Sequence, residues 1–233
     1  MTVPAADITA LRESTDRLLA AVEKLDDSAC AAPSLLPGWT RGHVLAHLAR
    51  NADALVNVLA GRPMYADAEA READIERDAP RPLADHLEDL RTSTAGLERA
   101  MADRAGDQWE ATVALRNGVT DRASSVPFRR RVEVELHHVD LGIGYTLDDL
   151  PGDFVGRQLE NMARRFSDRP DVHPLELRAG EDRVLRTGRA ADGEEQPVVV
   201  TGTPTALVGW LTGRTAGTGL TASGGVLPPL PPL

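Results

Sequence analysis

Glu133-Val-Glu-Leu-His-His-Val-Asp-Leu141 is the most informative segment of the chain, because its spacing predicts both a helix and a polar site. Residues four positions apart lie one above the other on a helix, so Glu133 and His137 can direct a carboxylate oxygen and an imidazole nitrogen at one point. At about 100° per residue, Asp140 joins them in a polar stripe with apolar borders on both sides. Such a stripe faces the interior, where polar groups need partners. We therefore expect an inward-facing helix from about Pro127 to Gly144.

A second helix is expected from about Arg41 to Leu59, where apolar residues recur at helical spacing. Thr40 is a suitable N-cap for it, and Gly61-Arg-Pro63 follows its end. His47 lies at the edge of the apolar arc of this helix. Asn51 lies one turn further along the same face, where its amide could orient a cofactor or a bound substrate.

His47, Glu133 and His137 are candidate ligands of one metal ion. Two histidines and one carboxylate leave a coordination position open for water or substrate, which is how catalytic zinc is held. The alternative is a hydrogen-bonded core histidine beside an i,i+4 pair that satisfies itself. The spacing alone does not decide between the two, because Glu-x-x-x-His is common on helices.

His138 and His86 do not fit the pattern of the candidate metal ligands. His138 lies about 100° around the helix from His137, in a direction shared with Glu135 and Arg131, so we expect that face to be solvated and His138 not to be a ligand. His86 has no neighbouring ligand pattern and is expected on the surface.

Helical periodicity dominates the first two thirds of the chain. Helices joined by moderate loops favour an antiparallel bundle, and the facing side chains of a bundle are a common place for metal sites. The expected helices cover Ile8 to Leu25, Arg41 to Leu59, Leu83 to Ala102 and Pro127 to Gly144, and a further one covers Gly152 to Phe166.

The period changes after this region. Short runs rich in β-branched residues predict strands at Pro174–Arg178, Arg183–Arg186 and Gln196–Thr201, and Thr203–Leu211 predicts a capped helix that Gly213 ends. The proline-rich tail should be extended, because proline has no amide proton to donate. The predicted fold class is α+β, with a four-helix bundle over residues 1–168 and a small α+β domain with the tail over residues 169–233.

Composition argues against a nucleic-acid-binding protein and against a membrane protein. The 233 residues include 26 basic and 36 acidic side chains, and the net charge of −10 would repel nucleic acid. We expect no membrane span and a cytoplasmic location, because no apolar run approaches about 20 residues and Met1-Thr-Val-Pro-Ala-Ala-Asp7 lacks the pattern of a signal peptide. Cys30 is the only cysteine, so it cannot form an internal disulfide, and a small buried hydrophobe is its expected role.

Five ordered motifs resemble the mycothiol-dependent maleylpyruvate isomerases, metal enzymes of the DinB-like bundle superfamily. The motifs are Leu36-Pro-Gly-Trp-Thr-Arg-Gly-His-Val-Leu-Ala-His47, Asn51-Ala-Asp-Ala-Leu55, Pro63-Met-Tyr65 followed by Glu69-Ala-Arg71, Glu133 to Leu141, and Gly213-Arg214 before the proline-rich end. The resemblance implies a DinB-like bundle, zinc held by His47, Glu133 and His137, and a catalytic Arg214 contributed by the C-terminal domain. As an alternative, Arg214 is only a cation at a helix C-terminus, worth about 0.3–1 kcal/mol. Tyr65 and Arg71 also match family residues, but without an assigned role.

The resemblance also implies an activity, which is the cis to trans isomerisation of maleylpyruvate to fumarylpyruvate in gentisate degradation. Mycothiol would be the cofactor, and its zinc-activated thiolate would add to the double bond and leave it again. The partners are thus a small dicarboxylate substrate and a low-molecular-weight thiol. The alternatives are a zinc- and mycothiol-dependent S-transferase and a noncatalytic metal-binding member of the superfamily.

Overall fold

The protein consists of two compact units, Met1–Tyr145 and Thr146–Leu233. The computed structural model describes residues 3–167, 169–189 and 196–232. The division falls earlier than the boundary expected after residue 168, because α7 (Gly152–Phe166) packs against α8 (Pro204–Leu211) and β4 (Arg183–Thr187) of the second unit. Asp168 itself lies outside the described residues, as do Met1 and Thr2 of the expected N-terminal pattern.

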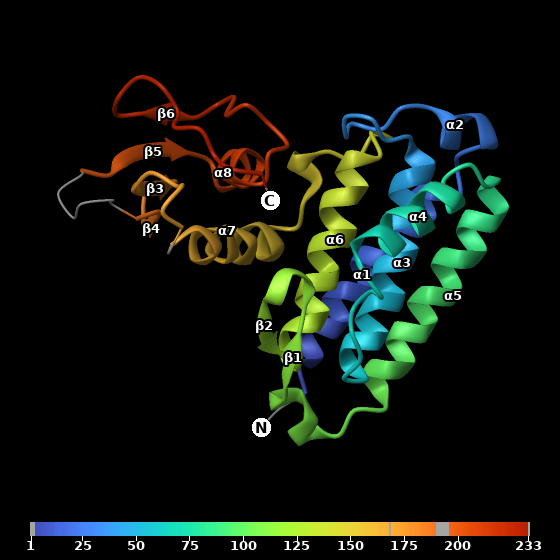
Figure 1. The fold of residues 1–233 in the computed structure, drawn as a ribbon. Coiled ribbons are helices and arrows are strands. Elements are labelled where there is room, and N and C mark those ends of the chain that lie inside the picture. Colours follow the sequence, from blue (N-terminus) through green and yellow to red (C-terminus); the bar gives the residue numbers. More distant parts are fainter. Residues whose placement is uncertain (1–2, 168, 190–195, 233) are drawn as a thin grey trace. The chain divides into compact units, whose positions relative to one another are not determined.

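Four long helices form the first unit, as the periodicity predicts (Figure 1). The helix α3 is central, because it packs against α5 and α6, while α1 packs against α6. Most residues of α3 are buried, and its expected N-cap is confirmed: the Thr40 hydroxyl accepts from the His43 amide, and His43 Nδ1 accepts from the Thr40 amide at 3.2 Å. The bounds of the four helices are α1 Ala5–Val22, α3 Arg41–Leu59, α5 Leu83–Ala102 and α6 Val126–Asp140.

The core of this unit is aliphatic. Leucines of three helices supply much of it, and each of the following is no more than 2% exposed: Leu18, Leu45, Leu48, Leu55 and Leu90. Cys30 belongs to the same core at 2% exposure, in the short helix α2 (Asp27–Ala31). The prediction that this cysteine is a buried hydrophobe is therefore confirmed.

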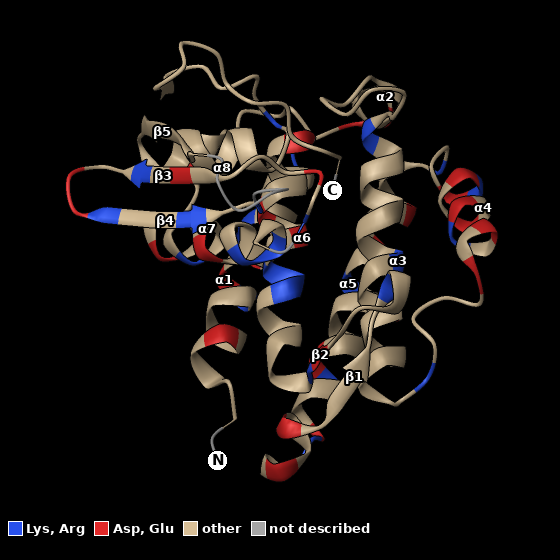
Figure 2. Ribbon diagram, turned by 60° about the vertical axis from the view of Figure 1, so that its left-hand side comes forward, with Lys and Arg blue, Asp and Glu red and all other residues tan. Residues whose placement is uncertain are grey.

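Smaller elements connect the long helices, and the sequence pattern does not predict them. The helix α4 (Ala68–Asp78) buries only Ile75 and Asp78, so it lacks the apolar stripe that identifies a helix. Acidic residues outnumber basic ones along it (Figure 2). Salt bridges from Arg50, Arg77 and Arg81 surround the buried Asp78 carboxylate. The hairpin of β1 (Thr112–Ala114) and β2 (Thr120–Arg122) precedes α6.

Residues 79–86 bring α3 and α5 close together. His86 is only 2% exposed, and its Nε2 lies 3.3 Å from the Ala79 carbonyl oxygen, so its expected surface position is wrong. The reason is Gly42 of α3, which has no side chain and so allows the Ala79 carbonyl to approach the helix closely.

The second unit is a mixed four-stranded sheet with two helices. The strand order is β4-β3-β5-β6, where β3 pairs antiparallel with β4 and parallel with β5, and β6 is antiparallel to β5. The three predicted strands are confirmed, whereas β6 is too short to be recognised from its pattern. Thr203 caps α8, and Gly213 follows it with φ +73°. The strand bounds are β3 Leu175–Ala179, β4 Arg183–Thr187, β5 Val198–Gly202 and β6 Thr221–Ala222.

The tail after Gly225 carries neither helix nor strand up to residue 232. Among the described residues, no helix combines the length and the apolar character that a membrane span requires.

Replacing Gly42 with alanine tests the close approach of α3 and Ala79. An added Cβ would lie 2.1 Å from the Ala79 carbonyl oxygen, so we expect a loss of at least about 2 kcal/mol in the free energy of unfolding. Urea unfolding monitored by circular dichroism measures it. The matched control is Gly96→Ala in α5, where the nearest atom is 3.9 Å away and alanine should stabilise the helix by about 0.5–1 kcal/mol. Equal effects of the two substitutions would contradict this account.

Candidate metal centre

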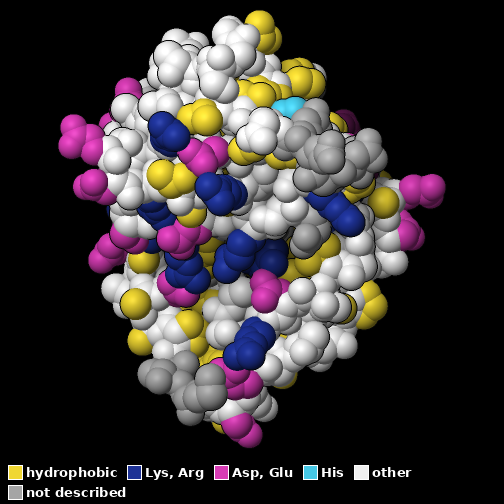
Figure 3. Space-filling view, turned by 90° about the vertical axis from the view of Figure 1, so that its left-hand side faces the viewer, with side chains coloured by type: hydrophobic (Ala, Val, Ile, Leu, Met, Phe, Trp, Pro, Cys, Tyr) yellow, Lys and Arg dark blue, Asp and Glu magenta, His cyan; other side chains and the backbone are white. Residues whose placement is uncertain are grey.

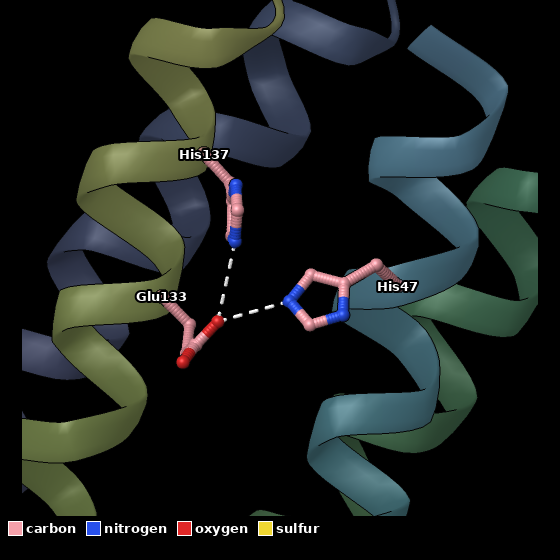
Figure 4. Close-up of side chains that lie close together, drawn as sticks. All are labelled: His47, Glu133 and His137. Carbon is pink, nitrogen blue, oxygen red and sulfur yellow. Dashed lines mark hydrogen bonds and ion pairs between the residues drawn. The ribbon is translucent and has the colours of Figure 1, made fainter. Parts of the chain in front are cut away.

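Two helices bring three predicted ligands together (Figure 4). His47 projects from α3, and Glu133 and His137 project from α6 one turn apart. Glu133 Oε2 lies 3.0 Å from His47 Nε2 and 3.3 Å from His137 Nε2. One ligand atom from each of the three residues lies within 4.8 Å of the other two.

This arrangement fits a divalent metal ion. Zinc bonds of about 2.1 Å in tetrahedral geometry place neighbouring ligand atoms about 3.4 Å apart, and the two distances to Glu133 Oε2 are close to that spacing. The imidazole planes of His47 and His137 are 79° apart, with their ring centroids separated by 4.7 Å. The rings therefore approach the carboxylate from different directions, as the ligands of one ion do.

The second nitrogen of each imidazole also has a partner. His137 Nδ1 lies 2.8 Å from Asp140 Oδ2, and a carboxylate in this position orients a ligating histidine and raises its basicity. His47 Nδ1 lies 3.1 Å from Arg71 Nη2. Arginine can only donate, so His47 Nδ1 is the acceptor and its ring proton is on Nε2, facing Glu133. A metal ion at Nε2 would take the place of that proton.

The site favours an ionised Glu133. Burial alone would raise its pKa, but hydrogen bonds from His137 and His47 outweigh burial and hold the pKa well below its usual range. Burial lowers the pKa of His47, opposed by its hydrogen bond to Glu133. For His137, burial is outweighed by the hydrogen bonds to Asp140 and Glu133, so its pKa is raised. A carboxylate and a neutral His47 are the forms that bind a metal.

Asn51 lies on the same face of α3, as expected, and is 4% exposed. Its Oδ1 accepts a hydrogen bond of 2.8 Å from Arg130 Nη1, which also donates to the Leu48 carbonyl at 2.8 Å. Burial lowers the pKa of Arg130 to about 10. This contact occupies the Asn51 oxygen. The role of Asn51 in orienting a cofactor stays a prediction.

The face of α6 that carries Glu135 and His138 is buried, so the prediction of a solvated face is wrong. Glu135, His138 and Arg131 are 1%, 3% and 6% exposed. The helix α1 covers this face, where Ser14 Oγ donates to Glu135, and the Tyr145 hydroxyl donates to it at 2.6 Å. His138 stacks on the Tyr145 ring and does not belong to the cluster of three ligands.

Arg214 follows α8 in the second unit. Its amide donates to the Gly209 carbonyl at 2.8 Å, and its Nη1 donates to the Thr212 carbonyl at 2.8 Å. Both contacts are with the C-terminal turn of α8. They fit the alternative interpretation, in which Arg214 is only a cation at a helix C-terminus. Its catalytic role stays a prediction.

The fold and the cluster define a class of proteins in which a helical bundle with a two-histidine, one-carboxylate site is joined to a small α+β unit. Residues 11–142 match the family model of the mycothiol maleylpyruvate isomerase N-terminal domain. Residues 149–232 match the model of the MDMPI C-terminal domain. The chain therefore belongs to the mycothiol maleylpyruvate isomerase family.

Solved structures agree with the family models. A crystal structure of the mycothiol-dependent maleylpyruvate isomerase is 28% identical, with a TM-score of 0.89 and coverage of 100% of both chains. A histidine-to-alanine mutant of the mycothiol-dependent maleylpyruvate isomerase matches with a TM-score of 0.88, at 28% identity and 100% coverage of both chains. No curated protein matches the chain.

Metal analysis of single variants tests the cluster. We expect His47→Ala, Glu133→Ala and His137→Ala to lose stoichiometric zinc, because each removes one of three ligands. The loss in affinity for zinc should exceed the roughly 10- to 100-fold loss that is typical when a residue that only hydrogen-bonds to a ligand is replaced. Inductively coupled plasma mass spectrometry of the purified proteins measures the zinc content.

The matched controls are His43→Gln on α3 and His138→Gln on α6, which change histidines outside the cluster and should retain zinc. Unchanged zinc in the three ligand variants, or an equal loss in the controls, would rule out the site.

Proposed function

We propose that the protein isomerises maleylpyruvate to fumarylpyruvate, with zinc at His47, Glu133 and His137 and with mycothiol as cofactor. The observation that carries the proposal is the convergence of these three donors in a chain that matches the isomerase family over both units. A role in gentisate degradation belongs to the same proposal and rests on the resemblance alone. The cytoplasmic location expected from the sequence pattern is also part of the proposal.

Zinc and the thiol together would supply a thiolate, because metal coordination deprotonates a thiol, and a thiolate can add reversibly to a conjugated double bond. Glu133 contributes a single negative charge against the two positive charges of the ion. The cluster therefore keeps a net positive charge, which favours a thiolate and an anionic substrate.

The chain itself offers no suitable sulfur. Cys30 is 2% exposed, and its pKa is raised by burial and by the nearby carboxylates of Asp27 and Asp26. A buried thiol with a raised pKa is a poor nucleophile at neutral pH. These properties support a cofactor as the source of the thiolate.

Arg214 is proposed to bind the substrate and to stabilise the negative charge that develops on it. A guanidinium group can bind a carboxylate through two parallel hydrogen bonds, and it stays charged throughout the reaction. The half-buried side chain of Arg214 suits this role, because partial removal from water strengthens a charged contact.

An assay of purified, zinc-loaded protein with maleylpyruvate, in the presence and absence of mycothiol, tests the function. We expect fumarylpyruvate only when mycothiol is present, with no consumption of the thiol, because it leaves the product again. Mass spectrometry of the products and titration of free thiol measure both. Stoichiometric consumption of the thiol would instead identify an S-transferase, and zinc binding without turnover a noncatalytic member of the family.

The variant Arg214→Ala separates catalysis from metal binding in the same assay. We expect full zinc content and a loss of turnover of about 100-fold or more, which is typical when one charge-stabilising group is removed. Arg178→Ala is the control and should retain turnover, because this exposed side chain on the inner strand β3 pairs with Glu176. Loss of zinc in Arg214→Ala, or unchanged turnover, would contradict the proposed role.

A further inference from the structure

A cavity of about 920 Å³ lies within the first unit, between the segment that follows α3 and the region of the β1–β2 hairpin. Both walls belong to one compact unit, so the cavity does not depend on the second unit. None of the three metal ligands lines this cavity, and neither does Arg214. The charged and aromatic side chains in its lining are Arg62, Tyr65, Asp67, Arg104 and Arg116.

The lining is predominantly basic. It holds three arginines against the single carboxylate of Asp67, and that carboxylate caps α4 by accepting a hydrogen bond of 2.6 Å from the Ala70 amide. On the face shown in Figure 3, by contrast, acidic and basic side chains are interspersed. A basic cavity in a chain with a net charge of −10 concentrates anions.

None of these three arginines has an acidic partner in the part of the chain that the structure describes, and Arg62 donates to the Asn57 side-chain oxygen. Arg104 donates from Nη1 to the Leu59 carbonyl and from Nη2 to the Gln108 carbonyl, each at 2.6 Å, so backbone contacts fix its position without neutralising it. Arg116 is exposed in the hairpin turn, where Asn117 and Gly118 adopt φ of +59° and +73°. The cavity thus contains cationic charge that the described residues leave uncompensated.

Tyr65 connects the cavity with the metal centre. Its ring lines the cavity and lies 5.9 Å from the guanidinium carbon of Arg71. Arg71 in turn contacts His47 Nδ1 at 3.1 Å. Burial raises the pKa of Tyr65, and Glu133 adds to this effect, which is consistent with the short path. Only two side chains therefore separate the cavity from a metal ligand.

We propose that this cavity is a carboxylate-binding subsite, in which Arg116 holds the substrate carboxylate that lies farther from the metal. The proposal rests on the proposed function, which supplies a substrate with two carboxylates. An anion is favoured over a neutral polar ligand, because only an anion compensates the positive charge of the lining. Arg116 determines affinity for the dicarboxylate, and Arg104, fixed by its backbone contacts, adds positive charge to the lining.

Calorimetric titration of zinc-loaded protein with maleate, without any thiol, tests the subsite directly. We expect Arg116→Gln to weaken maleate binding about fivefold, the upper end for an exposed ion pair, and to reduce the dependence of binding on ionic strength. The matched control is Arg122→Gln on the same hairpin, where the side chain is 63% exposed and pairs with Glu110 outside the cavity. It should bind maleate as the wild type does.

Turnover kinetics provide the second readout. Arg116→Gln should raise the KM for maleylpyruvate by a similar factor and leave the KM for mycothiol unchanged. A change in the KM for mycothiol alone would overturn the proposal and assign the cavity to the thiol. Absence of maleate binding by the wild type, or equal affinity in wild type and Arg116→Gln, would also overturn it. Because the titration needs no turnover, it gives a result even if the proposed isomerase activity is absent.

Discussion

The contact of one carboxylate with two imidazoles is the constraint on which the site depends. Glu133 Oε2 lies within 3.3 Å of His47 Nε2 and His137 Nε2, and these residues come from two different helices. Withdrawing an ionised carboxylate partly from water is costly unless its partners offset the loss. The two imidazoles, and a metal ion that binds to all three residues, provide that compensation. The contact therefore fixes the relative register of α3 and α6 within the bundle.

Much of this arrangement follows from the sequence, because the residues concerned obey simple periods. The long helices repeat their apolar residues about every 3.6 positions, three strands are short runs rich in β-branched and apolar residues, and the i,i+4 spacing selects Glu133 and His137. The helix α4 does not follow from the sequence, because Ile75 is its only buried apolar residue. The face with Glu135 and His138 is predicted as solvated for a different reason, because the groups that bury it, from α1 and Tyr145, are polar. A polar face buried by polar partners has the same sequence pattern as a solvated one.

In the first unit, the metal centre and the cavity that Tyr65 lines both carry positive charge. Three ligands with one negative charge leave a divalent ion partly uncompensated, while Asp140 contacts His137, and Arg71, which pairs with Glu72, contacts His47. The cavity next to Tyr65 contributes further arginines without acidic partners in the described residues. A chain that is acidic as a whole thus presents a basic region beside its ligand cluster, which suits an anionic substrate and a thiolate. Family membership and the electrostatics of the site lead independently to the same class of ligand.

Optical titration of the cobalt-substituted protein with mycothiol tests whether the three ligands present a metal ion to the thiol. Cobalt(II) occupies zinc sites, and its bond to a thiolate produces an intense charge-transfer absorption in the near ultraviolet. We predict that this band appears on addition of mycothiol, saturates at one thiol per metal, and is absent in Glu133→Ala. Binding of cobalt by the wild type without any such band on addition of the thiol would contradict the claim that this cluster presents a metal ion to sulfur.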